Sequence, residues 1–279
     1  MPMPPAAPSS EQAPPGAAEA RVIARAVEAL GGIALGDALL EFLRTQAVFD
    51  SGLVLLYQRR RRPKVLSEAL SHPLRSNDAA AYVGGAYLLD PFRIYAQRLK
   101  APEVVRLADI APEDFYSSTY FRSYYVSSRL VDEINFLVPV APSEVVAVCV
   151  GRSQAMPPFD EQELDRFRAW LPMVSALFSR HLALAGPAAG RDAREGEDTE
   201  HHRLEARLAA FAADVLTPRE HEVVQHLLHG HAASAIAISL NMSVQTVRVH
   251  RRNVYEKLQI SSLGELFSMA MQSVLSEDT

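Results

Sequence analysis

The sequence has a single cysteine, no long apolar run and no excess of basic residues, and each shortage excludes a class of protein. Cys149 cannot form an internal disulfide, and its place in the apolar run VVAVCV predicts a packed small hydrophobe rather than a reactive thiol. No apolar run approaches the ~18 residues of a membrane span, and no basic leader precedes a hydrophobic block. We therefore expect a soluble cytoplasmic protein without a membrane span or a signal peptide.

The net charge of −5 excludes a protein that is coated in basic surface. Any affinity for nucleic acid must therefore come from a local patch of charge. A length of 279 residues with 48% hydrophobic side chains is enough for two cores, so two domains are expected.

Signatures of catalysis are also missing. The chain has no glycine-rich phosphate loop, nucleophile elbow or metal-ligand spacing, and the adjacent His201 and His202 cannot share one helix face. A phosphoacceptor receiver needs an acidic pair near its first strand and a later lysine, whereas Asp50 stands alone and only Lys100 follows Lys64 in the N-terminal part. We expect no enzymatic activity, no cofactor and no metal site.

Two stretches of unusual composition divide the chain. Residues 1–18 hold six prolines and predict a disordered lead, because they cannot bury enough surface to offset the entropy of ordering. Residues 186–200 mix glycine, proline, alanine and alternating charges, which is typical of a flexible linker. A larger domain at 19–185 and a smaller one at 201–279 are expected beside this linker.

The larger domain alternates helical and strand patterns. Apolar residues at helical spacing from Val22 to Leu30 predict a first helix that ends at Gly31 and Gly32. We then predict a buried strand at 52–57, followed at the basic run 59–62 by an exposed turn rather than a nucleic-acid patch. The next elements are a helical stretch at 79–99 that is broken at Pro91 and a helix from Pro112 through Tyr124. A hairpin of strands 131–140 and 144–152 and a closing helix at 160–184 complete the domain. This order predicts an α+β domain, a central antiparallel sheet with helices on its faces, of the GAF or PAS kind.

The smaller domain carries start and stop signals for short helices. Thr217, Pro218 and Glu220 form an N-cap, a first-turn proline and a capping box, and Gly230 is free to end this first helix in a left-handed conformation. A second helix at 234–240 stops at Asn241, a residue that tolerates positive φ. This spacing predicts a tight turn between two crossing helices.

A third helix begins at the cap Ser243 and reaches about Leu258. At about 100° per residue, Val247 and Val254 share a face that packs, while a basic stripe lies on the opposite face. Such a helix fits a major groove, and the predicted base contacts are Gln245, Arg248, Val249 and Arg252. The predicted contacts to DNA phosphates are Ser243, Thr246, His250, Arg251 and Lys257.

At these residues the chain resembles the LuxR-type (GerE/NarL-like) helix-turn-helix domain. The positions that match the family pattern are Leu216, Thr217, Arg219, Glu220, Glu222, Val223, Gly230, Ile236, Ala237, Leu240, Ser243, Thr246, Val247, His250, Lys257, Leu258, Ser261 and Leu266. The departures are Ser234, Ala235 and Ile238, where Lys and Glu are common, and Asn241, where Gly is usual. The resemblance implies an all-α four-helix domain that binds double-stranded DNA, and RNA polymerase as a partner.

A homodimer is expected from two helices. Along the closing helix of the larger domain, Leu164, Phe167, Leu171, Val174 and Phe178 form an apolar seam beside Trp170, and we expect it to pack partly on its own sheet and partly on a partner helix. The resemblance implies that a fourth helix at 263–274, with Leu266, Phe267 and Ala270, pairs two DNA-binding domains. Two half-sites about 10 base pairs apart in an inverted repeat follow from such a dimer.

The region from Tyr82 to Tyr125 is rich in aromatic residues, as small-molecule pockets are. Asp90-Pro91 resembles a segment of acyl-homoserine-lactone receptors in which the aspartate accepts a hydrogen bond from the ligand, although Asn77 and Ala81 stand where those receptors carry Trp and Tyr. The predicted ligand-binding residues are Tyr82, Tyr87, Asp90, Tyr116 and Tyr120. The alternative is that Asp90 only caps the helix begun by Pro91.

The acids Asp132 and Glu133 open a predicted strand, where burying both would be costly. We expect one to face solvent and the other to meet an arginine such as Arg122 or Arg129. Taken together, the sequence predicts a transcription regulator whose N-terminal domain senses a small molecule. The rival interpretation is an N-terminal domain that mediates protein partnership without a small ligand, and a catalytic N-terminal domain comes third.

Overall fold

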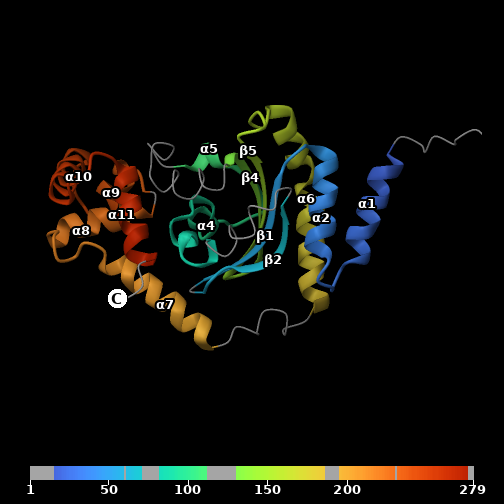
Figure 1. The fold of residues 1–279 in the computed structure, drawn as a ribbon, viewed down its shortest axis with the longest axis horizontal. Helices are drawn as coiled ribbons and strands as arrows, with labels where there is room; N and C mark the ends of the chain where they lie inside the picture. Colours follow the sequence, from blue (N-terminus) through green and yellow to red (C-terminus); the bar gives the residue numbers. More distant parts are fainter. Residues whose placement is uncertain are drawn as a thin grey trace, which may run out of the picture.

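The computed structural model describes residues 16–59, 61–70, 82–111, 130–185, 195–229 and 231–275. A sheet with helices on both faces forms the N-terminal part, and a group of short helices forms the C-terminal part beside it (Figure 1). Within the described ranges, no helix is long and apolar enough to cross a membrane.

One antiparallel sheet carries the N-terminal part. Its strands are β1 (Ser51–Gln58), β2 (Lys64–Leu70), β3 (Glu103–Arg106), β4 (Leu130–Ala141) and β5 (Glu144–Ser153), in the order β2-β1-β5-β4-β3. The predicted strand at 52–57 and the predicted hairpin at 131–140 and 144–152 are confirmed. The short edge strand β3 was not predicted, because four residues are too few to show a period of two.

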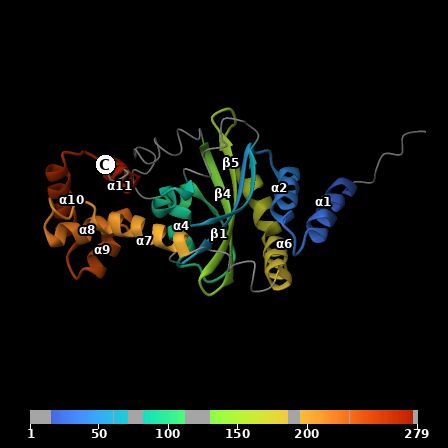
Figure 2. The same ribbon diagram turned by 60° about the horizontal axis from the view of Figure 1, so that its bottom comes forward.

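Both faces of the sheet are buried, which explains why its strands are continuous apolar runs. Helices α1 (Ala17–Glu28), α2 (Leu35–Gln46) and α6 (Glu161–Ala185) lie on one side, and α2 and α6 pack there on alternate residues such as Val54 and Val148. The other face, with Leu55 and Cys149, is covered by a 3-10 turn η2 (Ala86–Leu89), α4 (Pro91–Ala96) and α5 (Leu107–Ile110). Figure 2 shows α4 on this side of the sheet, opposite α2 and α6. The predicted α+β architecture is thus confirmed.

The apolar seam of α6 belongs to the core of the chain itself. Leu164, Phe167, Val174 and Phe178 are all buried, and Trp170 packs edge-on against Phe42 of α2 with ring centroids 4.8 Å apart. The expectation that part of this seam packs on the chain's own sheet is confirmed. Leu171 is only half-buried, and contact of the rest of the seam with a partner helix stays a prediction.

Two local expectations in the N-terminal part can be compared with the structure. The break expected at Pro91 is confirmed: the 3-10 turn η2 lies before it, and Pro91 begins α4 with Asp90 as the N-cap, because proline suits the first helical turn. Asp132 is buried and accepts a bidentate pair of hydrogen bonds from Arg106, at 3.1 Å from Nε and 2.7 Å from Nη2. The predicted partners Arg122 and Arg129 and the helix predicted from Pro112 through Tyr124 lie outside the described residues, as do residues 1–15 of the predicted disordered lead.

The C-terminal part consists of α7 (Glu195–Ala210), α8 (Pro218–Leu228), α9 (Ala233–Ser239), α10 (Val244–Leu258) and α11 (Leu263–Leu275). The last four confirm the predicted helices. The capping box between Thr217 and Glu220 is present in full, and Asn241 has the positive φ of 51° that the tight turn requires. Helix α7 begins inside the stretch predicted as a linker at 186–200, and the expected stop at Gly230 lies outside the described residues.

Candidate functional site

The outward face of α10 is open to solvent. The Ser243 hydroxyl accepts a hydrogen bond from the Thr246 backbone N–H at 3.0 Å and so fixes the start of the helix. Val247 and Val254 are buried against the rest of the domain. The exposed residues of this helix include Gln245, Arg248, Val249 and Arg252. Helix α10 lies at the end of the molecule that is remote from the sheet (Figure 1), so the N-terminal part leaves this face accessible.

The predicted phosphate contacts surround this face but are not equivalent. Ser243 and Thr246 are exposed and hydrogen-bonded to each other at 2.8 Å, whereas His250 and Arg251 are half-buried. Lys257 points back into the domain, where its ammonium Nζ lies 2.6 Å from the buried Glu220 carboxylate. Lys257 therefore forms an ion pair within the domain.

Glu220 is the anchor of this internal network. Its carboxylate accepts hydrogen bonds from the Thr217 N–H at 2.9 Å, the Thr217 hydroxyl at 2.8 Å and Lys257. Burial raises the pKa of Glu220, but these hydrogen bonds and the Lys257 charge outweigh it and hold that pKa at about 2. The pair joins the start of α8 to the end of α10.

In the N-terminal part, the hydroxyls of Tyr57 and Tyr82 and the carboxylate of Asp90 meet on the inner face of the sheet, the face that η2, α4 and α5 cover. The buried Asp90 carboxylate accepts hydrogen bonds from the hydroxyls of Tyr82 and Tyr57, the latter at 3.1 Å, and from the Phe92 N–H at 2.9 Å. Burial raises the pKa of Asp90, although the three hydrogen bonds oppose this effect. Burial also raises the pKa of Tyr57 and Tyr82, and the negative charge of Asp90 raises it further. The helix cap expected of Asp90 is confirmed.

The predicted ligand set is only partly brought together. Tyr82 and Asp90 are in contact, and the Tyr87 ring lies beside Tyr82 with centroids 6.4 Å apart. Tyr116 and Tyr120 lie outside the described residues. Sequence reasoning missed Tyr57, whose only signal was an aromatic residue at the end of a buried strand.

Tyr87 reaches away from this cluster toward helix α7. Its hydroxyl lies 2.7 Å from Nδ1 of His201, whose buried ring stacks on the tyrosine at a centroid distance of 5.8 Å. The Arg93 guanidinium lies over the same tyrosine ring, 4.9 Å from its centroid. Burial lowers the pKa of His201, and Glu205 at 3.1 Å opposes that effect. Tyr87 thus links the Asp90 cluster to the C-terminal part.

A second link between the two parts is a chain of hydrogen bonds through two histidines. Arg98 of the N-terminal part donates to Nε2 of His231, so the His231 Nδ1 must carry the proton that is shared with Nδ1 of His226 at 2.8 Å. The remaining nitrogen of His226 then donates to the Ser239 hydroxyl at 3.3 Å. Only two neutral imidazoles satisfy every bond of this relay.

The contact between the two parts is expected to weaken as pH falls below about 6.5, the usual pKa of histidine. Burial first, and then the charges of Arg98 and the neighbouring histidines, lowers the pKa of His231, while burial and His229 lower that of His226 against a small opposing effect of Glu222. Because the folded pKa values are depressed, the stabilising contribution is complete above the unfolded pKa and is lost as pH falls through the folded values.

Amide hydrogen exchange at residues 86–89, which face α11, measures this contact as a function of pH. His231→Gln keeps an acceptor and a donor but does not titrate, so it should flatten the response, whereas the exposed His202→Gln is the matched control. An unchanged pH response in His231→Gln would assign the effect to other groups, such as His201.

Helix α11 is covered within the chain. Leu266, Phe267 and Ala270 are all buried, and α11 packs against α7, α8 and the 3-10 turn η2 of the N-terminal part. These three side chains therefore pack within the chain, and pairing of two copies through this helix stays a prediction.

Residues 214–270 match the family described as "Bacterial regulatory proteins, luxR family". A protein of Aeromonas salmonicida named an HTH-type transcriptional regulator in the exeN 3' region is 26% identical over 56% of this chain and 80% of its own length. The transcriptional regulatory protein UhpA of Salmonella typhimurium is 44% identical, but over 23% of this chain and only 32% of its own length. Both relatives are named as regulators of transcription.

The N-terminal part is similar to a solved structure. The crystal structure of the VqsR LBD domain from Pseudomonas aeruginosa superimposes with a TM-score of 0.54 at 24% identity, over 61% of this chain and 99% of that one. This similarity concerns the fold alone. Residues 214–270 thus form a helix-turn-helix domain of the luxR family, and that domain makes the chain a DNA-binding regulator of transcription.

Proposed function

We propose that the chain acts as a homodimer that reads a specific DNA sequence through α10, under the control of a small molecule held by its N-terminal part. The observation that carries the first half is the exposure of Gln245, Arg248, Val249 and Arg252 on one face while Val247 and Val254 are buried on the other. Arginine and glutamine side chains on such a face can each make paired hydrogen bonds to guanine or adenine edges.

Selection of sites from a random DNA pool by the full-length protein tests this proposal. We expect enrichment of one sequence as two inverted half-sites about 10 base pairs apart. A strictly monomeric protein at micromolar concentration, bound to a single asymmetric half-site, would contradict the dimer, and a pool without enrichment would contradict specific reading. RNA polymerase is proposed as a further partner, since the relatives regulate transcription.

We further propose that the N-terminal domain spans 19–185 and is of the GAF or PAS kind, and that the DNA-binding domain spans 201–279. The five-stranded antiparallel sheet with helices on both faces supports the first assignment. The start of α7 at Glu195 makes the proposed linker of 186–200 helical in its last residues.

The ligand would lie at the Asp90 cluster, where Tyr57, Tyr82 and Asp90 place two hydroxyls and a carboxylate against an apolar sheet face. One observation favours the rival interpretation of a protein-interaction domain: three donors of the chain itself already occupy the Asp90 carboxylate. A ligand that uses Asp90 must therefore displace a tyrosine hydroxyl.

Asp90→Asn separates these two interpretations. Asparagine caps a helix as well as aspartate does, so the cap on Phe92 should survive, and a ligand that donates to the carboxylate should be lost. We expect the wild type to retain a small molecule through purification, detected by mass spectrometry, and the variant to retain far less with a small change in melting temperature. The exposed Asp109→Asn serves as control. If neither protein carries a ligand, the protein-interaction interpretation is favoured.

A further inference from the structure

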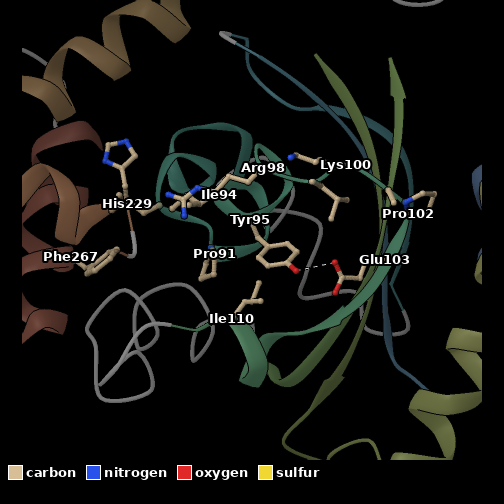
Figure 3. A pocket seen from close by; sticks show the side chains of 13 residues that line it. Pro91, Ile94, Tyr95, Arg98, Lys100, Pro102, Glu103, Ile110, His229 and Phe267 are labelled. Atoms are coloured by element: carbon tan, nitrogen blue, oxygen red, sulfur yellow. Dashed lines mark hydrogen bonds between the residues drawn. The ribbon is translucent and has the colours of Figure 1, made fainter. Parts of the chain in front are cut away.

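A cavity of about 440 Å³ lies where the N-terminal part meets the C-terminal helices (Figure 3). Leu89, Pro91 and Phe267 are buried and supply apolar surface from both parts. Ile94, Tyr95 and Ile110 are half-buried and complete the apolar lining. This volume falls within the range of about 300–1,000 Å³ that is usual for small-molecule sites.

Basic groups dominate the polar part of this cavity. Arg98 and Lys100 line it together with His229. In the part of the chain that the structure describes, the acidic lining residue is Glu103, which accepts a hydrogen bond from the Tyr95 hydroxyl at 2.9 Å. Among the described residues, neither Arg98 nor Lys100 forms an ion pair. The partner of Arg98 is an uncharged acceptor, so its positive charge is not neutralised.

We propose that this cavity binds a small amphipathic organic anion, a carboxylate attached to an aromatic or branched apolar body. The apolar lining accommodates the body, and the guanidinium of Arg98 and the ammonium of Lys100 attract the carboxylate. The same two charges disfavour a cation of equal size. The site is distinct from the Asp90 cluster, because Tyr57, Tyr82 and Asp90 are not among its lining residues.

A ligand in this cavity contacts both parts of the chain, so it binds their docked arrangement better than a separated one. By mass action it therefore stabilises that arrangement. The open face of α10 lies outside the contact, so the ligand would set the orientation of the DNA-binding domain rather than cover its reading helix. This consequence for DNA rests on the proposed function, whereas binding of the anion does not.

Titration of the full-length protein with 4-phenylbutyrate, followed by calorimetry, tests the site, and 4-phenylbutan-1-ol is the uncharged match. We expect the acid to bind about tenfold more tightly than the alcohol. Arg98→Gln and Lys100→Gln should each lower the affinity for the acid and leave the affinity for the alcohol unchanged. Lys100→Gln is the sharper variant, because Arg98 also contacts His231 across the interface. The exposed Arg168→Gln on α6 is the control.

Equal affinities for acid and alcohol, an unchanged Lys100→Gln, or no binding of the acid at roughly millimolar concentration would each overturn the proposal. Fluorescence of Trp170, the single tryptophan, reports whether the N-terminal part of each variant is folded. A protein that selects a DNA site but ignores the acid overturns the cavity proposal alone. One that binds the acid but selects no DNA overturns the proposed function alone.

Discussion

Replacing Arg248 or Arg252 by alanine is expected to weaken specific DNA binding by ~1 to 3 kcal/mol and to relax the base preference at one position of each half-site. Both side chains project from the open face of α10, and within the described ranges no buried group holds either of them. The ion pair between Arg252 and Glu256, at 3.8 Å, joins two exposed groups and contributes little.

Competition binding with the selected site and its single-base variants measures this effect at fixed salt, since affinity for DNA depends steeply on ionic strength. Arg168→Ala removes an exposed arginine from α6 and should leave the affinity unchanged. Wild-type affinity in both the Arg248 and the Arg252 variants would remove them from the reading surface.

Replacing Glu220 is expected to have the largest effect on the stability of the C-terminal helices. Glu220→Ala removes the capping box at the start of α8 and leaves the Lys257 ammonium without its partner, at a cost of about 2 to 4 kcal/mol. Glu222 lies two positions further along the same helix in an exposed pair with Arg219, so Glu222→Ala should change stability by less than about 0.5 kcal/mol.

Acid should reproduce part of this loss. The folded pKa of Glu220, about 2, lies below the usual value of a glutamate, so its stabilising contribution is complete above about pH 4.5 and disappears as pH falls toward 2. Amide hydrogen exchange of α8 and α10 measures it directly. Glu220→Gln should remove that acid dependence, and an unchanged profile in the glutamine variant would show that other carboxylates cause it.

The same network bears on Lys257, which the sequence assigns to a DNA phosphate. In the structure its ammonium reaches Glu220, 37 positions away in the chain. Lys257→Met should therefore lower the stability of the helices, whereas a lysine that only neutralises a phosphate would reduce the salt dependence of DNA binding by about one unit and leave stability unchanged.

The sequence by itself determined the features that depend on neighbours a few residues apart. The capping box of α8, the turn at Asn241 and the outward stripe of α10 follow from spacings of three and four residues and from the conformational freedom of single residues. The long strands β1, β4 and β5 were equally clear, since each is an apolar run bounded by turn residues.

Only the tertiary structure decided which distant side chains share a site. Tyr57 and Asp90 lie 33 positions apart and meet because β1 and α4 face each other across the inner side of the sheet. The sequence could not distinguish whether the apolar seams of α6 and α11 pack on a partner or on the chain's own core. Helical periodicity shows that one face of a helix is buried, but not which element buries it. The cavity lined by Arg98 exists because the N-terminal part and the C-terminal helices come into contact, and no local pattern of residues specifies that contact.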